Sequence, residues 1–310
     1  MSSNSAALAF GPVVRAMREA YRNGGNAMEA ARALLGADAN LPMAVLVAYD
    51  LQAGTYVDSA RAQPGRTETW CSQLADLLRP LVTHSPSSIL EVGVGEATTL
   101  AGVVEQLGVT LRWAGGFDVS WSRIDAARGW LAERHIAAET FVGDLFAIPL
   151  ADGAVDVVYS SHSLEPNGGR ELEAVGECLR VARRAVVLVE PLYELAAPDA
   201  QARMRSHGYV RGLREAAESL GARVVDYRLL PYTGNPLNPS GVLVLEKDTQ
   251  APATDPLAWR CPLTHAPLIP EGDLFLAADV GIAYPVMRGI PLLRPEHGVV
   301  ASRLADTMRR

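Results

Sequence analysis

The stretch Ser87-Ser-Ile-Leu-Glu-Val-Gly-Val-Gly-Glu-Ala-Thr-Thr-Leu100 decides the fold of this 310-residue chain. It begins as a β-rich apolar run, reaches two glycines and passes directly into a helical pattern. Glycines at such a turn let the backbone approach a ligand that a Cβ atom would exclude. Glu91, two positions before Gly93, suits a ligand with a positively charged group, because a carboxylate repels a pyrophosphate. The stretch therefore predicts a ligand-binding turn after the first strand of a Rossmann-like sheet.

Strands and helices alternate after this turn. The pattern predicts strands at residues 89–92, 111–117, 139–142, 155–159, 185–189, 223–230 and 242–246. Only a loop of turn formers, residues 231–241, separates the last two strands, and a parallel crossover needs a longer connection. We therefore expect an α/β fold with a Rossmann-like seven-stranded sheet whose last two strands pair antiparallel.

Acidic residues follow the next two predicted strands. Asp118 ends the second strand, where a carboxylate can accept hydrogen bonds from both ribose hydroxyls. Asp144 follows the third strand, where it can accept from an adenine amino group while Leu145 offers its backbone N–H. Each acid alone is more often a helix cap than a ligand, but three strand ends together indicate a nucleoside site. Thr98 occupies the third small-residue position of the nicotinamide pattern, which disfavours a dehydrogenase.

The motifs Glu91-Val-Gly-Val-Gly95, Asp118 and Gly143-Asp144 resemble the first three motifs of class I S-adenosylmethionine-dependent methyltransferases. The resemblance covers residues 87–247 and departs at Ala97, where many members have a third glycine. It implies S-adenosyl-L-methionine as the cofactor and S-adenosyl-L-homocysteine as the product. The cofactor-binding residues expected from it are Glu91, Gly93, Gly95, Asp118, Asp144, Leu145 and Ser161.

The acceptor should lie at the loops that follow strands four to six, since ligands gather at the carboxyl ends of such sheets. Methyl transfer is an in-line displacement, so alignment matters most and a base is needed only where the acceptor must lose a proton. His162 has the most suitable pKa for a base, with Glu190 and Glu165 as alternatives. His162 could equally cap the following helix or pack under the cofactor. The residues expected to line the acceptor site are Tyr49, Gln52, Tyr56, Tyr193, His207, Tyr209, Asn235 and Asn238.

Composition shifts divide the chain. We expect an N-terminal helical cap or lid over residues 1–86, the methyltransferase domain over 87–247, a linker over 248–257 and a small β-rich domain over 258–310. The small domain contains Tyr284-Pro-Val-Met-Arg-Gly289-Ile-Pro and resembles the zinc-ribbon-like activators of certain methyltransferases. Cys261 is its only cysteine, and His265 and His297 do not complete a four-ligand set, so no metal is expected.

Charge and cysteine content indicate which acceptors and which cellular compartment suit the protein. The chain is 20% charged with a formal net charge of -7, and such a field repels phosphate backbones and disfavours a nucleic-acid acceptor. Three widely separated cysteines indicate a reducing compartment. No basic leader precedes Pro12, and no apolar run approaches the roughly 20 residues of a membrane span. We therefore expect a cytoplasmic protein that does not enter membranes.

These inferences favour one function and leave others open. The favoured function is methyl transfer to an oxygen or nitrogen of a small molecule, such as a metabolite, a sugar or a natural product. The tail leaves open a tRNA, rRNA or protein methyltransferase with a fused activator domain. A cofactor-binding regulator or scaffold without turnover is a third alternative, because no residue excludes it. The sequence also leaves a homo-oligomer open.

Overall fold

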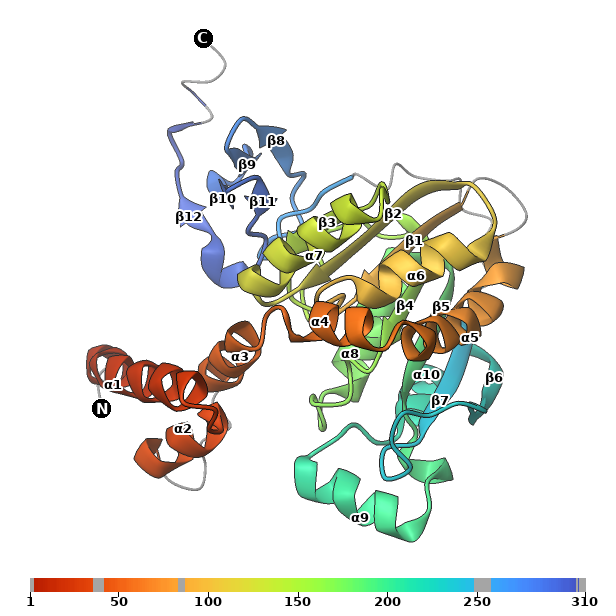
Figure 1. Cartoon of the computed structure of the whole chain (residues 1–310). Coiled ribbons are helices and arrows are strands. Elements are labelled where there is room, and N and C mark those ends of the chain that lie inside the picture. The colour runs from red at the N-terminus through yellow and green to blue at the C-terminus, as the bar shows by residue number, and fades with distance from the viewer. Residues whose placement is uncertain (1–2, 36–41, 83–86, 248–257, 305, 307–310) are drawn as a thin grey trace.

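A seven-stranded sheet forms the centre of the computed structural model, which describes residues 3–35, 42–82, 87–247, 258–304 and 306. The strand order is β3-β2-β1-β4-β5-β7-β6, and β7 runs antiparallel to both neighbours while the other pairs are parallel (Figure 1). The predicted fold class and its antiparallel closing pair are confirmed. The strands are β1 (Ser87–Val92), β2 (Leu111–Asp118), β3 (Glu139–Val142), β4 (Val155–Ser161), β5 (Ala182–Pro191), β6 (Arg223–Leu229) and β7 (Ser240–Glu246).

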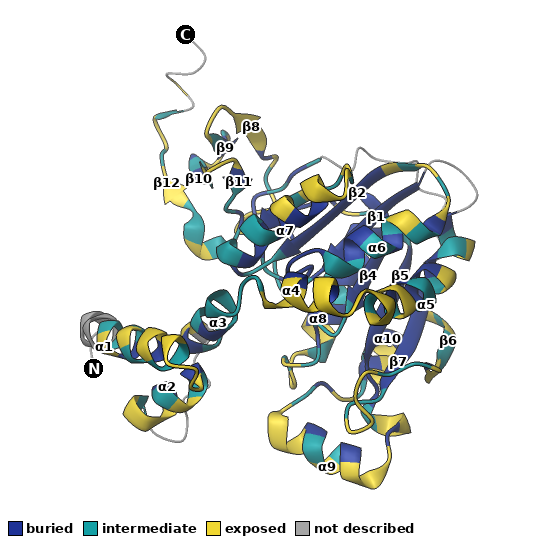
Figure 2. Ribbon diagram, viewed as in Figure 1, coloured by how far each residue is buried: buried dark blue, intermediate teal, exposed yellow. Residues whose placement is uncertain are grey.

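Helices cover both faces of this sheet. Successive strand residues point to opposite faces, so Ile89 packs with the helices on one side and its neighbour Leu90 with those on the other. Figure 2 shows the central strands buried along their length. The helices of the first face are α5 (Pro64–Val82), α6 (Thr98–Leu107) and α7 (Trp121–Glu133), and those of the second are α8 (Glu171–Val181) and α10 (Leu213–Ser219).

Four helices precede α5. Helices α1 (Ser3–Arg22), α2 (Ala27–Leu35) and α3 (Pro42–Leu51) enclose a small core of their own and project from the main body, whereas α4 (Thr55–Ala62) lies against it (Figure 1). Helix α5 differs, because Leu74 and Leu78 are buried in the core of the sheet. The part of the chain expected to be a cap therefore contains both a separate helical unit and one layer of the main domain.

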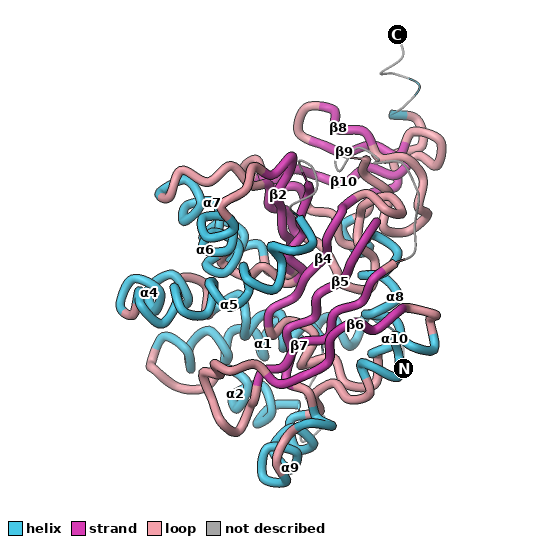
Figure 3. The backbone as a smooth tube through the Cα atoms, turned by 90° about the vertical axis from the view of Figure 1, so that its right-hand side faces the viewer, coloured by secondary structure: helices cyan, strands magenta, loops and turns pink. Residues whose placement is uncertain are grey.

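A small antiparallel sheet near the C-terminus lies beside β3 (Figure 1), and Figure 3 shows it at one end of the large sheet. The Leu293 N–H donates to the Val142 carbonyl at 2.8 Å. The Trp259 and Phe141 rings pack edge to face, with their centres 4.9 Å apart. The predicted linker, residues 248–257, lies outside the described residues. The small sheet comprises β8 (Ile269–Glu271), β9 (Leu274–Ala277), β10 (Ile282–Met287), β11 (Ile290–Pro291) and β12 (Val299–Val300).

The buried Tyr284 side chain fills the interior of this small domain, and its hydroxyl lies 3.4 Å from the Cys261 sulfur. No group of three or more potential metal ligands occurs within the described residues. Nor does that part of the chain contain a helix long and apolar enough to cross a membrane.

Candidate active site

The turn after β1 has the backbone that its glycines predict. Gly93 and Gly95 adopt φ values of +66° and +54°, in the left-handed region that favours glycine. A Cβ atom on Gly93 would lie 2.3 Å from the Ser163 Cβ, so a side chain cannot be placed there without movement of the β4 loop. A Cβ atom on Gly95 would meet only the Arg123 Nη1 atom, at 3.5 Å. The turn therefore leaves room above Gly95 that a side chain would occupy.

The ends of β1, β2 and β3 are joined by hydrogen bonds. The Gly95 N–H donates to Asp118 Oδ2 at 3.2 Å, and the Asp118 carbonyl accepts from the Gly143 N–H at 3.0 Å. The Ser120 N–H donates to the other Asp118 carboxylate oxygen at 2.9 Å. Burial raises the pKa of Asp118, and these hydrogen bonds together with the charge of Arg123 oppose that rise. Asp118 is thus fixed beside the glycine turn.

Glu91 is buried at the end of β1. Its carboxyl group accepts a hydrogen bond from the Tyr159 hydroxyl at 2.8 Å. Burial raises the pKa of Glu91 to about 8, although the Tyr159 hydrogen bond opposes the shift. A cation brought beside this carboxyl group would favour its ionised form, so the position suits a positively charged ligand group.

The remaining predicted cofactor residues also follow strand ends. Asp144 Oδ1 accepts from the Phe146 N–H at 2.9 Å, which closes a local turn, and Leu145 is buried beside it. At the end of β4, Ser161 Oγ accepts from the Trp70 ring N–H at 3.1 Å. The structure thus brings all seven of these residues to one edge of the sheet, while their contacts with a cofactor remain predictions.

His162 and Glu165 form a hydrogen-bonded pair after β4. The His162 Nδ1 atom lies 2.8 Å from Glu165 Oε2, and its Nε2 atom lies 2.7 Å from Ser240 Oγ. Burial lowers the pKa of His162, but the hydrogen bond and charge of Glu165, with the charge of Glu190, raise it overall. His162 also adopts φ +57°, so its loop holds it in a rare backbone conformation.

Glu190 holds that loop in place. One of its oxygens accepts from the N–H groups of Ser163 and Leu164, both at 3.1 Å, and the other accepts from the Glu165 N–H at 3.0 Å. Burial raises the pKa of Glu190 to about 7. Among the three predicted catalytic residues, His162 and Glu165 therefore pair with each other, and Glu190 supports the backbone that carries them.

Several predicted acceptor residues converge on Glu165. Asn238 Nδ2 donates to Glu165 Oε2 at 3.2 Å. Burial raises the pKa of the Tyr49 hydroxyl, and the nearby Tyr56, Glu165 and Tyr209 groups raise it further. Burial and then Glu165 likewise raise the pKa of Tyr209. Asn238 thus bonds Glu165, and the pKa values of Tyr49 and Tyr209 respond to the charge of the same carboxylate, although these residues are far apart in the sequence.

The other predicted acceptor residues make local contacts instead. Gln52 lines a hollow of about 310 Å³ within the cap itself. The Tyr193 hydroxyl accepts from Arg205 Nη1 at 2.6 Å, and the exposed His207 ring lies 5.4 Å from the Tyr209 ring. Asn235 Oδ1 accepts from the Leu237 N–H at 2.9 Å, which forms a turn. No interaction with Glu165 is found for these four residues in the described structure.

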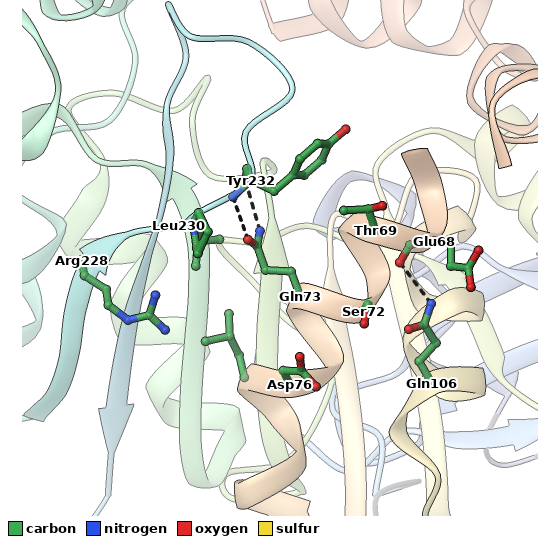
Figure 4. A pocket seen from close by; sticks show the side chains of 11 residues that line it. Glu68, Thr69, Ser72, Gln73, Asp76, Gln106, Arg228, Leu230 and Tyr232 are labelled. Carbon is green, nitrogen blue, oxygen red and sulfur yellow. Dashed lines mark hydrogen bonds between the residues drawn. The ribbon is translucent and has the colours of Figure 1, made fainter. Parts of the chain in front are cut away.

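Residues that the sequence did not single out complete the site. The Trp70 ring of α5 lies 5.6 Å from the His162 ring and 6.4 Å from the Tyr232 ring. Gln73, on the same helix, makes two hydrogen bonds with the Tyr232 backbone, which fasten the β6–β7 loop to α5 beside a groove of about 690 Å³ (Figure 4). In the sequence, Trp70 and Gln73 look like ordinary residues of an amphipathic helix, and nothing in the pattern indicates that they contact His162 or the Tyr232 backbone.

Residues 89–185 match a family model described as a methyltransferase domain. This part of the chain is a methyltransferase domain. The match contains Glu91, both glycines, Asp118, Asp144 and the His162–Glu165 pair. The class of enzyme predicted from the sequence is therefore confirmed.

Solved structures resemble the chain in fold. The magnesium protoporphyrin IX methyltransferase from Synechocystis PCC 6803 with bound SAH has 12% sequence identity and a TM-score of 0.50, over 64% of this chain and 98% of that one. A chain of the complex between the Haloferax volcanii Trm112 methyltransferase activator and a methyltransferase has 13% identity and a TM-score of 0.49, over 64% and 96%. At these identities the likeness concerns the fold alone. No curated protein matches the chain in sequence.

The methyltransferase domain has its predicted site at the carboxyl edge of the sheet. The glycine turn, Asp118 and Asp144 lie on one side, and the His162–Glu165 pair lies on the other. The cap reaches this edge through Tyr49, and the β6–β7 loop reaches it through Asn238. The predicted cofactor residues and the His162–Glu165 pair therefore lie at the same edge of the sheet, on neighbouring strand ends.

Proposed function

We propose that the chain transfers a methyl group from S-adenosyl-L-methionine to an oxygen or nitrogen of a small molecule. The observation that carries this proposal is the joined edge of the methyltransferase domain. There the Gly95 N–H donates to Asp118 Oδ2, and the Asp118 carbonyl accepts from the Gly143 N–H after β3. Glu91, two residues before the first glycine of the turn, is buried. These groups suit the ribose, adenine and ammonium parts of this one cofactor.

The residues present fit the cofactor. A side chain at Gly95 would occupy space that the structure leaves clear, and Asp118 stands where a carboxylate can accept from ribose hydroxyls. Glu91 would face the ammonium group, while Asp144 and Leu145 would hold the adenine and Ser161 the methionine side. When bound, S-adenosyl-L-methionine supplies an electrophilic methyl group.

The other half of the edge would bind and orient the acceptor. Tyr49, Tyr209 and Asn238 would fix its polar groups around Glu165, and the cap would exclude water. Where the acceptor must lose a proton, the Nε2 atom of neutral His162 would take it once Ser240 Oγ has given up its hydrogen bond to that atom, and Glu165 would stabilise the resulting imidazolium through the 2.8 Å hydrogen bond to Nδ1. Ser240, 2.7 Å from the other ring nitrogen, would fix the orientation of the ring.

A small acceptor is favoured over a polynucleotide by the negative charge of this half. The chain carries a net charge of -7, and Glu165 and Glu190 stand within the acceptor half itself. Phosphate groups would be repelled by such surroundings. The small C-terminal domain would act as a fused support that covers the edge of β3, since Leu293 bonds Val142 and Trp259 packs on Phe141.

The proposal is tested by calorimetry with S-adenosyl-L-homocysteine, followed by a screen of small-molecule acceptors with radiolabelled S-adenosyl-L-methionine. Binding together with labelled product is the expected result. Binding without turnover on any small molecule, RNA or protein would favour a regulator or scaffold instead. Label transferred to RNA, with a rate that falls steeply with salt, would favour the nucleic-acid alternative.

A further inference from the structure

We propose that Arg123 is a positioning residue that couples the cofactor loops of the methyltransferase domain to Tyr49 of the cap. The inference rests on the proposed function, because it assumes that the glycine turn and Asp118 hold the cofactor. It adds a residue that belongs to neither the predicted cofactor set nor the predicted acceptor set. Arg123 would act on the acceptor only through Tyr49.

Arg123 is 6% exposed and is held by the cap. Its Nε–H donates to the Tyr49 carbonyl at 3.1 Å. Its guanidinium carbon lies 5.0 Å from the centre of the Tyr49 ring and 4.9 Å from that of the Tyr56 ring. Cation–π contacts of this kind are attractive and hold the guanidinium group beside the two rings.

The same guanidinium group borders the cofactor side. Its Nη1 atom lies 3.5 Å from the position that a Cβ of Gly95 would occupy, and its charge lowers the pKa of Asp118. Its Nη2 atom is buried and has no hydrogen-bond partner among the residues that the structure describes. A buried charged donor without a partner is costly, so the position of this side chain responds to what lies beside it. Arg123 therefore touches both halves of the site.

Two further contacts anchor the cap to the same cofactor loops. Glu96 follows Gly95 directly, and its carboxylate accepts from the N–H groups of Gly54 at 3.0 Å and Val57 at 2.8 Å. Gly54 has φ +100°, which favours glycine, and it separates α3 from α4. The cap is thus attached to the residue that follows the second cofactor glycine.

The second anchor is Asp50, the neighbour of Tyr49. Its carboxylate accepts from Ser120 Oγ at 2.7 Å and from the Ser122 N–H and hydroxyl at 3.1 and 2.9 Å. Ser120 also donates its N–H to Asp118. A ligand that fixes the glycine turn and Asp118 would therefore fix the groups that hold Tyr49, and the two events should be linked thermodynamically.

Hydrogen exchange of the Gly54 and Val57 amides tests this coupling, because both N–H groups are bonded to Glu96. In the parent protein, saturating S-adenosyl-L-homocysteine should slow their exchange by about tenfold. In Arg123→Ala the slowing should fall to about threefold, because the Glu96 and Asp50 contacts remain, and by linkage the Kd for S-adenosyl-L-homocysteine should rise by no more than about tenfold. Arg123→Lys, which keeps the charge, should retain part of the slowing. Arg128→Ala is the matched control, since Arg128 lies on the same helix but bonds the Arg288 carbonyl.

The outcomes separate this inference from the proposed function. No binding of S-adenosyl-L-homocysteine by the folded parent protein would remove the proposed function. Binding that leaves the exchange of both amides unchanged in the parent would overturn the coupling alone. Full slowing retained in Arg123→Ala would overturn it too. A loss of affinity in that variant far beyond tenfold would show that Arg123 binds the cofactor directly, which contradicts a positioning role.

Discussion

The cofactor half and the acceptor half of the site share one edge of the sheet but are built differently. In the cofactor half, each contributing group lies within a few residues of a strand end. Its shape depends largely on local backbone conformation, as at Gly93 and Gly95. In the acceptor half, Glu165 brings together Tyr49, Tyr209 and Asn238 from across the chain. One half is defined by strand ends, and the other by the approach of side chains that are distant in the sequence.

This difference makes the two halves separable. A change at Gly95 should remove cofactor binding without disturbing the His162–Glu165 pair, because a side chain there does not meet the β4 loop. A change at His162 should affect transfer without changing cofactor affinity. Variants that mix the two effects would show that the halves are coupled more closely than their separate hydrogen bonds indicate.

The largest effect is expected for Gly95→Arg. The added side chain would fill the space above the turn, and φ +54° is unfavourable for any residue with a Cβ. We expect affinity for S-adenosyl-L-homocysteine to fall by about 1,000-fold or more, which corresponds to about 4 kcal/mol. Calorimetry measures this, and circular dichroism shows whether the fold is kept. Unchanged affinity in a folded variant would mean that the cofactor lies elsewhere.

His162→Ala should have the next largest effect, on transfer alone. Loss of a general base lowers the rate by about 100-fold or more, whereas the cofactor Kd should stay within about threefold. In the parent, transfer should become faster as the pH rises through the pKa of His162, because the base must be neutral. Glu165 raises that pKa, so the rise should come at a higher pH than for an ordinary histidine. An undiminished rate in His162→Ala would remove it as the base.

Asp118→Ala should weaken cofactor binding moderately. The ribose hydroxyls would lose a charged acceptor, and such hydrogen bonds contribute about 1.5–3 kcal/mol, or roughly 10- to 150-fold in Kd. Asp226→Ala is a suitable control, because this carboxylate pairs with Arg228 on β6. A variant at Asp118 that binds as tightly as the parent would show that the ribose does not contact this carboxylate.

The smallest expected effect is a proton released on cofactor binding. Burial raises the pKa of Glu91 to about 8, so the folded protein keeps this carboxyl group protonated from its ordinary range up to that pH. The contribution of protonated Glu91 to the free energy of unfolding is therefore lost as the pH rises through about 8. An ammonium group beside Glu91 would ionise it, and up to about one proton per site should be released at pH 7.

Calorimetry in two buffers of different ionisation enthalpy detects that proton. Glu91→Gln should bind S-adenosyl-L-homocysteine with a heat that no longer depends on the buffer. A buffer-independent heat in the parent protein would place the ammonium group away from Glu91.

The sequence predicted all seven strands of the large sheet, because each strand is a strongly apolar run and is bounded by turn-forming residues. Its strands differ from the observed ones chiefly at the ends; β5 begins at Ala182 where the sequence indicated residue 185. The cofactor set could be listed because each of its members follows a strand. Trp70, Gln73 and Arg123 could not be listed, because helical positions at ordinary amphipathic spacing do not reveal which tertiary contact they will make.

The sequence by itself determined the sheet, its antiparallel closing pair and the glycine turn with its acids, since hydrophobic periodicity and backbone conformation are local properties. Only the tertiary structure decided that Glu190 supports a loop, that Glu165 gathers the acceptor residues and that Arg123 lies between two tyrosines of the cap. These arrangements depend on which distant side chains become buried together. The burial of these side chains determines their pKa values and their hydrogen bonds, and no local sequence pattern shows which side chains will be buried together.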